Sequence, residues 1–178
     1  MLRHLVDRKS TLWQYLLPEQ REIIADCEKL IEDAHLYPKM LTDYSYIVFP
    51  MAKVYEGFLK KFLLDTELIS ESQYESDHFR IGKVLNPNLP DHLRIEGLYD
   101  RICSHVGRSD LADRFWQTWK RGRNLIFHYF PGNLQRITLP EAIETAQEIG
   151  STMSLAVTAC KLPLNQDSTF PETSSTSA

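Results

Sequence analysis

An arginine and a histidine five positions apart are the residues of this chain that most directly suggest a chemistry. Arg123 is followed at once by Asn124, and His128 closes the six-residue segment. Histidine can take up and return a proton near neutral pH because its unperturbed pKa is about 6.5. Arginine stays charged and can hold a phosphate through a forked pair of hydrogen bonds. Together these residue types indicate work on a phosphodiester, in which Asn124 would orient groups by hydrogen bonding.

The same segment also has a simpler interpretation. An arginine, an amide and a histidine on the polar face of a helix are often only solvated. Upstream, Glu56 can pair with Lys60 one helical turn on, an ordinary surface interaction of about 0.3 to 0.5 kcal/mol. Trp116 and Trp119 are expected in the core rather than as platforms for stacked bases.

The composition limits the classes of protein to which the chain can belong. Its 178 residues, 43% of them hydrophobic, suffice for one buried core and predict a single domain. A net charge of -4 at pH 7 argues against bulk coating of nucleic acid, so any RNA affinity must be local. Three scattered cysteines match no metal-binding spacing, which favours a reducing cytoplasm. No apolar run has the length of a signal peptide or membrane span, so no membrane contact is expected.

Hydrophobic spacing predicts an all-α chain of five or six helices, since no segment alternates with period two. Pro50 marks either the first turn of the second helix or a kink in a longer element that begins near Asp43. The single domain is predicted to span residues 1–162, and the Ser- and Thr-rich residues 163–178 are predicted to be a disordered tail. Four of the expected helices run from Pro18 to a point before Pro38, from Pro50 to Leu64, from His78 to Leu85, and from Pro90 to about His105. The fifth begins at Asp110, after the N-cap Ser109, and ends at a turn at 131–133. The sixth begins near Thr138, Pro140 and Glu141 and carries an apolar stripe as far as Val157.

The helix predicted from Asp110 onward places the motif on two different faces. Taking about 100° per residue, its apolar seam comprises Leu111, Phe115, Trp119, Gly122, Ile126 and Tyr129. His128 falls on the opposite, polar arc, whereas Arg123 lies at the border of the apolar one. Either the helix frays near His128, or a second copy of the domain supplies the complementary group across a two-fold axis. A homodimer with the seams near its axis is therefore expected, although the seam can equally be intramolecular core.

The segment from Arg123 to His128 resembles the RNxxxH form of the R-x4-6-H motif of HEPN-domain ribonucleases, which are compact helical bundles. The layout of residues 12–162, with one long helix after the motif and Tyr55 to Lys60 upstream, is similar to the HEPN toxin domain of the ribonuclease LS type of bacterial toxin–antitoxin systems. In that group an acidic residue on an earlier helix accompanies the motif, and the matching position is Glu56. HEPN toxins that are paired with a nucleotidyltransferase carry a motif of the form R-x4-H-x-Y. This chain has Phe130 at the last position of that pattern, and its tyrosine, Tyr129, comes one place earlier.

The resemblance implies a HEPN-like bundle that cleaves RNA to 2′,3′-cyclic phosphate ends, as a toxin or an antiviral defence effector. The 2′-OH of RNA is itself the nucleophile, so the reaction needs proton transfer by His128 and charge stabilisation by Arg123 but no metal or other cofactor. Glu56 would orient the histidine or neutralise the arginine. The implied partners are RNA, a second copy of the chain and a cognate antitoxin protein.

Local charge around the motif agrees with an RNA substrate. Eight basic and five acidic residues lie between positions 90 and 136, and Arg114, Lys120 and Arg121 are the predicted RNA-binding side chains. The alternative function is a non-catalytic HEPN-like module that binds RNA or nucleotide, or that serves as a helical adaptor.

Overall fold

The computed structural model describes residues 4–36, 41–90, 97–106, 109–129, 131–133, 135–160 and 162. Over these residues the protein is all-α, as predicted, and contains no strand. The elements are α1 (Thr11–Tyr15), α2 (Pro18–Leu36), α3 (Ser45–Asp65), α4 (Glu71–Glu75), α5 (Ile81–Val84), α6 (Tyr99–Val106), α7 (Ser109–Trp119), a π-helical turn (Lys120–Asn124), a 3-10 turn (Pro131–Asn133) and α8 (Leu139–Cys160). The predicted tail, residues 163–178, lies outside the described residues.

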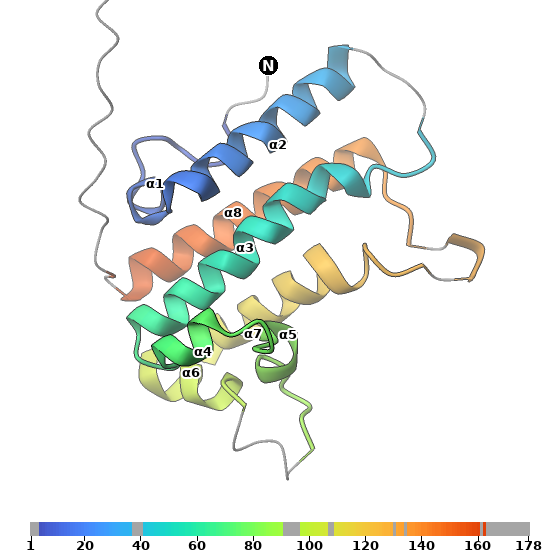
Figure 1. The fold of residues 1–178 in the computed structure, drawn as a ribbon. Helices are drawn as coiled ribbons and strands as arrows, with labels where there is room; N and C mark the ends of the chain where they lie inside the picture. The colour runs from blue at the N-terminus through green and yellow to red at the C-terminus, as the bar shows by residue number, and fades with distance from the viewer. Residues whose placement is uncertain are drawn as a thin grey trace, which may run out of the picture.

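Two long helices, α3 and α8, pack side by side at the centre of the bundle, with α2 along one side and α6 and α7 along the other (Figure 1). The helix α3 suits this central place because its face of buried residues runs from Ile47 to Leu63. It begins at Ser45, so Pro50 lies inside the helix rather than in its first turn. Proline has no N–H to donate to the carbonyl of Tyr46, yet the surrounding packing keeps the helix continuous.

Aromatic side chains tie α3 to α7 through the core. Phe62 and Phe115 meet edge to face, with ring centroids 5.1 Å apart. The buried Tyr55 hydroxyl donates a hydrogen bond of 3.1 Å to the Phe115 carbonyl. Burial raises the pKa of Tyr55 well above its ordinary value, so the phenol keeps the proton that it donates. These contacts fix the helix that leads into the Arg123 segment.

The predicted helices before Pro38 and after Thr138 are confirmed as α2 and α8. The short helices α1 and α4 were not predicted, because five residues are too few to show a helical period. Each begins with a serine N-cap, Ser10 or Ser70, whose hydroxyl accepts a backbone N–H. The helix predicted from His78 to Leu85 is shorter than expected, with only Ile81–Val84 helical. The predicted start at Pro90 and Asp91 runs into residues 91–96, outside the described part of the chain.

The apolar seam of α7 is part of the core of a single chain. Leu111, Phe115 and Trp119 are at most 2% exposed, and Gly122 is buried against α8. Tyr129, predicted on the same seam, is instead 80% exposed. From Leu111 to Gly122 the stripe is therefore intramolecular core, the second of the two predicted alternatives, because α3 and α8 already cover it. The expected homodimer would then have to use another surface.

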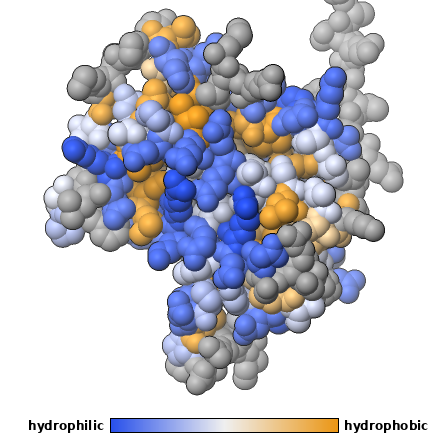
Figure 2. Space-filling model, turned by 180° about the vertical axis from the view of Figure 1, so that it is seen from behind, coloured by the Kyte–Doolittle hydropathy of each residue, from blue (hydrophilic) through white to orange (hydrophobic). Residues whose placement is uncertain are grey.

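Apolar side chains also reach the surface in separate patches surrounded by hydrophilic ones, as Figure 2 shows for the face opposite to that of Figure 1. Such scattered exposure is normal for a folded domain. In the described part of the chain, no helix combines the length and the apolar character needed to cross a membrane.

Candidate functional site

The Arg123 segment begins on a π-helical turn rather than on the straight α-helix that the sequence predicted. The amide of Leu125 donates to the carbonyl of Lys120 over 3.0 Å, a bond between residues five apart. Gly122 allows this turn to approach α8 closely, since a Cβ there would lie 3.0 Å from the Ile149 side chain. The helix ends at Asn124, seven residues before Pro131. Single π turns occur frequently at functional sites, and this one carries the arginine of the motif.

Arg123 is held from two sides. Its Nη2 atom lies 3.2 Å from Oε2 of Glu56 on α3, and its guanidinium carbon lies 4.8 Å from the ring centroid of Trp119. The arginine side chain remains 44% exposed and that of Glu56 32% exposed. Exposed ion pairs contribute at most about 1 kcal/mol, so an incoming phosphate can compete with the Glu56 carboxylate for the guanidinium.

Glu56 does not make the ordinary surface pair that its spacing also allowed. Lys60, one turn on, instead donates from Nζ to the backbone carbonyl of Ser76 over 3.5 Å. Phe49, Lys53 and Glu56 are spaced by four and three residues along α3 and therefore share one face. Lys53 is exposed, which adds a cation one turn away from the Arg123–Glu56 pair. Its spacing from Glu56 was the available signal, but a lysine one turn from a glutamate is too common to single out.

His128 lies beyond the helical turn, with an exposed side chain. The amide of Phe127 still donates to the carbonyl of Arg123 over 3.1 Å, which keeps the chain close to the turn as far as the residue before His128. No hydrogen bond or ion pair joins His128 to Arg123, Asn124 or Glu56 among the described residues. The structure thus brings Arg123 and Glu56 together and leaves the histidine unpaired. Catalytic hydrogen bonds are often absent until substrate binds, so this geometry does not disqualify the histidine.

The three predicted RNA-binding side chains differ in their surroundings. Lys120 is exposed. Arg114 is also exposed, and its Nε donates to the buried Thr152 hydroxyl over 3.3 Å. Arg121 is paired with two carboxylates of α8, at 2.8 Å from Glu148 and 3.5 Å from Glu144. Two neighbouring carboxylates offset the charge of Arg121, which makes it the least suited of the three to bind a phosphate.

An exposed aromatic pair, one member of which belongs to the motif segment, was not predicted from the sequence. Phe49 of α3 and Phe127 meet edge to face with ring centroids 5.6 Å apart, and they are 57% and 37% exposed. Phe127 is the immediate neighbour of His128, and Phe49 lies two turns before Glu56 on the same helix face. A phenylalanine in a largely apolar helix reads as core, so only the three-dimensional structure reveals that this pair is exposed.

In the described part of the chain, no group of three or more His, Cys, Asp or Glu side chains is placed to hold a metal ion. Comparison with protein families, with curated proteins and with solved structures found no match to this chain.

Proposed function

We propose that this chain is a metal-independent endoribonuclease of the HEPN class, with a HEPN-like bundle as its fold and a role as a cytoplasmic toxin or defence effector. The observation that carries the proposal is Arg123, which is held between Glu56 and Trp119 yet remains half-exposed, five residues before the exposed His128. An arginine that is positioned but weakly neutralised is suited to receive a phosphate.

The reaction divides among the residues of the motif. The 2′-oxygen of RNA forms a bond to phosphorus while the bond from phosphorus to the 5′-oxygen breaks, which leaves a 2′,3′-cyclic phosphate. His128 takes the proton from the 2′-OH or gives a proton to the leaving 5′-oxygen, and water makes the other of these two proton transfers. Arg123 leaves Glu56 and binds the non-bridging oxygens, where negative charge develops. Asn124 orients the phosphate by hydrogen bonds.

The surroundings of the motif supply a path for single-stranded RNA. Phe49 and Phe127 offer exposed rings on which bases can stack, an interaction of about 1 to 3 kcal/mol per base. Lys53 and Lys120 offer further exposed cations for the RNA backbone. This arrangement favours an unpaired stretch of RNA as the substrate.

A second copy of the chain completes the proposed site. Among the described residues no hydrogen bond joins His128 to Arg123 within one chain, whereas a two-fold axis can place the histidine of one protomer beside the arginine of the other. The interface must use a surface other than the buried seam of α7. A cognate antitoxin protein that covers the Arg123 and His128 segment would then block both protomers.

The decisive experiment is the incubation of purified protein with total RNA in excess EDTA. The His128→Ala and Arg123→Ala variants should each lose at least about 100-fold in cleavage rate. A positioned acid–base group such as His128 is worth about 10² to 10⁴, and a positioned donor to developing negative charge such as Arg123 is worth about 10² to 10³. His35→Ala and Lys9→Ala, both at exposed positions outside the site, should cut like the parent. Equal cleavage by the His128→Ala variant would overturn the assignment. RNA binding without cleavage by any form would support the binding-module alternative.

A further inference from the structure

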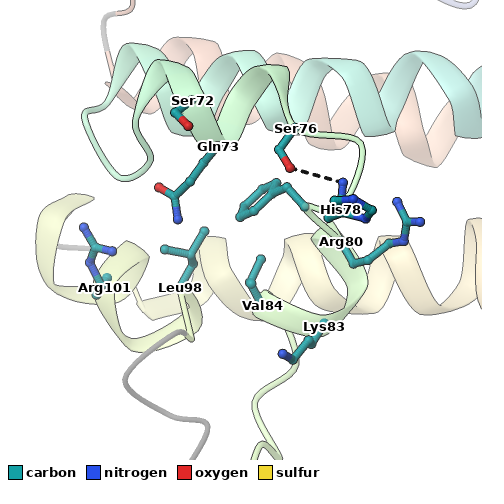
Figure 3. Close-up of a pocket in the computed structure, with 10 residues that line it drawn as sticks. Ser72, Gln73, Ser76, His78, Arg80, Lys83, Val84, Leu98 and Arg101 are labelled. Atoms are coloured by element: carbon teal, nitrogen blue, oxygen red, sulfur yellow. Dashed lines mark hydrogen bonds between the residues drawn. The ribbon is translucent and has the colours of Figure 1, made fainter.

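A second concave site lies among the short helices that follow α3 in the chain. It is a pocket of about 500 Å³ between α4, α5 and the start of α6, which is within the range of about 300 to 1,000 Å³ typical of small-molecule sites (Figure 3). None of the described residues that line it belongs to the Arg123 and His128 segment. The lining residues are Ser72, Gln73, Ser76, His78, Phe79, Arg80, Lys83, Val84, Leu98 and Arg101.

The middle of the pocket is apolar. Val84 and Leu98 are 7% and 3% exposed and lie at its centre, and Phe79, partly buried against the core, also lines it. The Leu98 amide donates to the Val84 carbonyl over 2.7 Å, which ties the two sides of this floor together. An aromatic ring and two branched aliphatic side chains form a surface that suits a flat aromatic group.

The rim of the pocket is basic. Arg101 lies at one end, and Arg80 and Lys83 lie at the other (Figure 3). Arg80 donates to a backbone carbonyl, that of Asp77, so this bond does not neutralise its charge. No carboxylate belongs to a described lining residue, although the chain as a whole carries a net charge of -4. A concentration of positive charge in an acidic protein attracts an anion.

One wall of the pocket supplies a directed donor. The Gln73 side-chain oxygen accepts a hydrogen bond of 3.0 Å from the Ser70 amide, as part of the capping box of α4. This bond fixes the orientation of the side chain, so its NH2 group points into the pocket (Figure 3). A fixed amide donor above an apolar floor can bind an acceptor on the edge of a nucleobase.

We propose that this pocket binds a mononucleotide, with the base against Phe79, Val84 and Leu98 and the phosphate on the basic rim. A nucleotide matches both parts of the pocket. Its flat base with hydrogen-bonding edges suits the apolar floor and the amide donor, and its phosphate is a compact anion that suits the basic rim. Arginine binds phosphate through paired N–H donors. Arg80 already donates to the Asp77 carbonyl, which makes Arg101 the main phosphate ligand and the residue to test. This inference stands apart from the proposed ribonuclease activity.

Isothermal titration with AMP, adenosine and inorganic phosphate in the absence of RNA tests the site. AMP should bind one per chain, and adenosine and phosphate should each bind at least about tenfold more weakly because each lacks half of the contacts. Arg101→Glu, at an exposed position, should weaken AMP binding at least about tenfold, and Phe79→Ala should do the same with unchanged helical content. Lys29→Glu, a matched charge reversal on the exposed surface of α2, should leave AMP binding unchanged.

Absence of AMP binding at millimolar concentration would overturn the proposal. Phosphate binding as tight as AMP binding would also overturn it, since the pocket would then be a simple anion site. Undiminished AMP binding by the Arg101→Glu variant would place the nucleotide elsewhere on the protein. Because no RNA is present, these outcomes are independent of whether the chain cleaves RNA.

Discussion

At the scale of single residues, the contacts of Arg123 hold its guanidinium in place but leave it accessible to a ligand, unlike those of a buried structural cation. A fully buried ion pair would resist exchange, since an uncompensated charge in the interior is costly. The Arg123–Glu56 pair lies at the surface, and the Trp119 ring beneath it keeps the guanidinium in place when the carboxylate is displaced. In the proposed site, Glu56 would therefore position Arg123 while its charge competes with the substrate phosphate.

Replacing Glu56 by glutamine should separate these two effects. Loss of the carboxylate uncovers the arginine, so the KM for RNA should fall about two- to fivefold, and its dependence on salt should steepen by about one charge. The kcat should also fall, because Arg123 loses a partner that orients it. Glu148→Gln is the matched control: it uncovers Arg121 on the same turn and should lower KM without changing kcat. Steady-state kinetics at two salt concentrations measure both, and identical kinetics for the parent and Glu56→Gln would remove Glu56 from the site.

The exposed aromatic pair, Phe49 and Phe127, is expected to contribute to RNA binding rather than to catalysis. Phe49→Ala should raise the KM for a single-stranded RNA about tenfold while leaving kcat unchanged, because base stacking contributes to binding rather than to chemistry. Leu36→Ala, at another exposed apolar position, should have no effect. Stability should change by no more than about 0.5 kcal/mol, since Phe49 is 57% exposed. A change in light-scattering mass at unchanged KM would instead assign the pair to a contact between subunits.

At the scale of elements, the Trp119 platform depends on how closely α5 packs against α7. A Cβ at Gly82 would lie 2.6 Å from the Trp119 indole nitrogen, and that ring is only 2% exposed and cannot move aside. Gly82 is therefore required by close approach between two helices. The same contact links the wall of the basic pocket to the ring that supports Arg123.

Gly82→Ala should destabilise the fold by about 1 to 3 kcal/mol, the usual cost of overpacking a core. It should also reduce RNA cleavage beyond the loss of folded protein, because the Trp119 ring beneath Arg123 is displaced. The contrasting variant is Gly57→Ala, where the new Cβ would meet only the end of the Gln20 side chain and alanine favours the helix. Urea titration of both variants checks the comparison, and equal stabilities would contradict it.

The start of α8 predicts a dependence on pH. The backbone amide and the hydroxyl of Thr138 both donate to the Glu141 carboxylate over 2.7 Å, and these bonds hold the pKa of that carboxyl below its usual value. A lowered pKa means that the stabilisation is present above the ordinary carboxyl pKa and is lost as the pH falls through the folded-state value. Glu141→Gln should therefore melt below the parent near pH 7 and alongside it near pH 3. A constant difference between the two melting temperatures would show that charge is not involved.

Helices could be predicted from the sequence where one strong signal determines the local structure. Pro18 and Thr138 gave correct helix starts, and the apolar stripes of α2 and α8 are buried as expected. The π turn at Lys120 could not be foreseen, because hydrophobic spacing carries no signal for a single π turn. The sequence suggested Glu56 only through a family resemblance. Its meeting with Arg123 depends on the packing of α3 beside the π turn.

At the scale of the whole molecule, the buried seam changes where a partner subunit can dock. A homodimer that joins Arg123 of one chain to His128 of the other must use surface that is exposed in the single chain. The proposal of a composite site is independent of which exposed surface is used, so it can be tested before the interface is known.

Mixing the Arg123→Ala and His128→Ala proteins tests the composite site. After subunit exchange, about half of the dimers combine the two variants, and each of these has one intact site of two, so about a quarter of the parental RNA cleavage should return. Light scattering should report a dimer at micromolar concentration. Mixtures that exchange subunits yet remain inactive would confine each site to one chain.

Because of the π turn, a relative with a very similar sequence could still place its arginine differently. A relative that lacked one residue between Lys120 and Asn124 would regain α-helical bonding there. Its arginine would then be rotated by about 100° from the position that faces Glu56. Both chains would carry the same arginine, asparagine and histidine and would align with one short gap. The loss or gain of a single codon in this turn would therefore decide whether the arginine meets its carboxylate, which gives the lineage a one-step route between two different sites on the same scaffold.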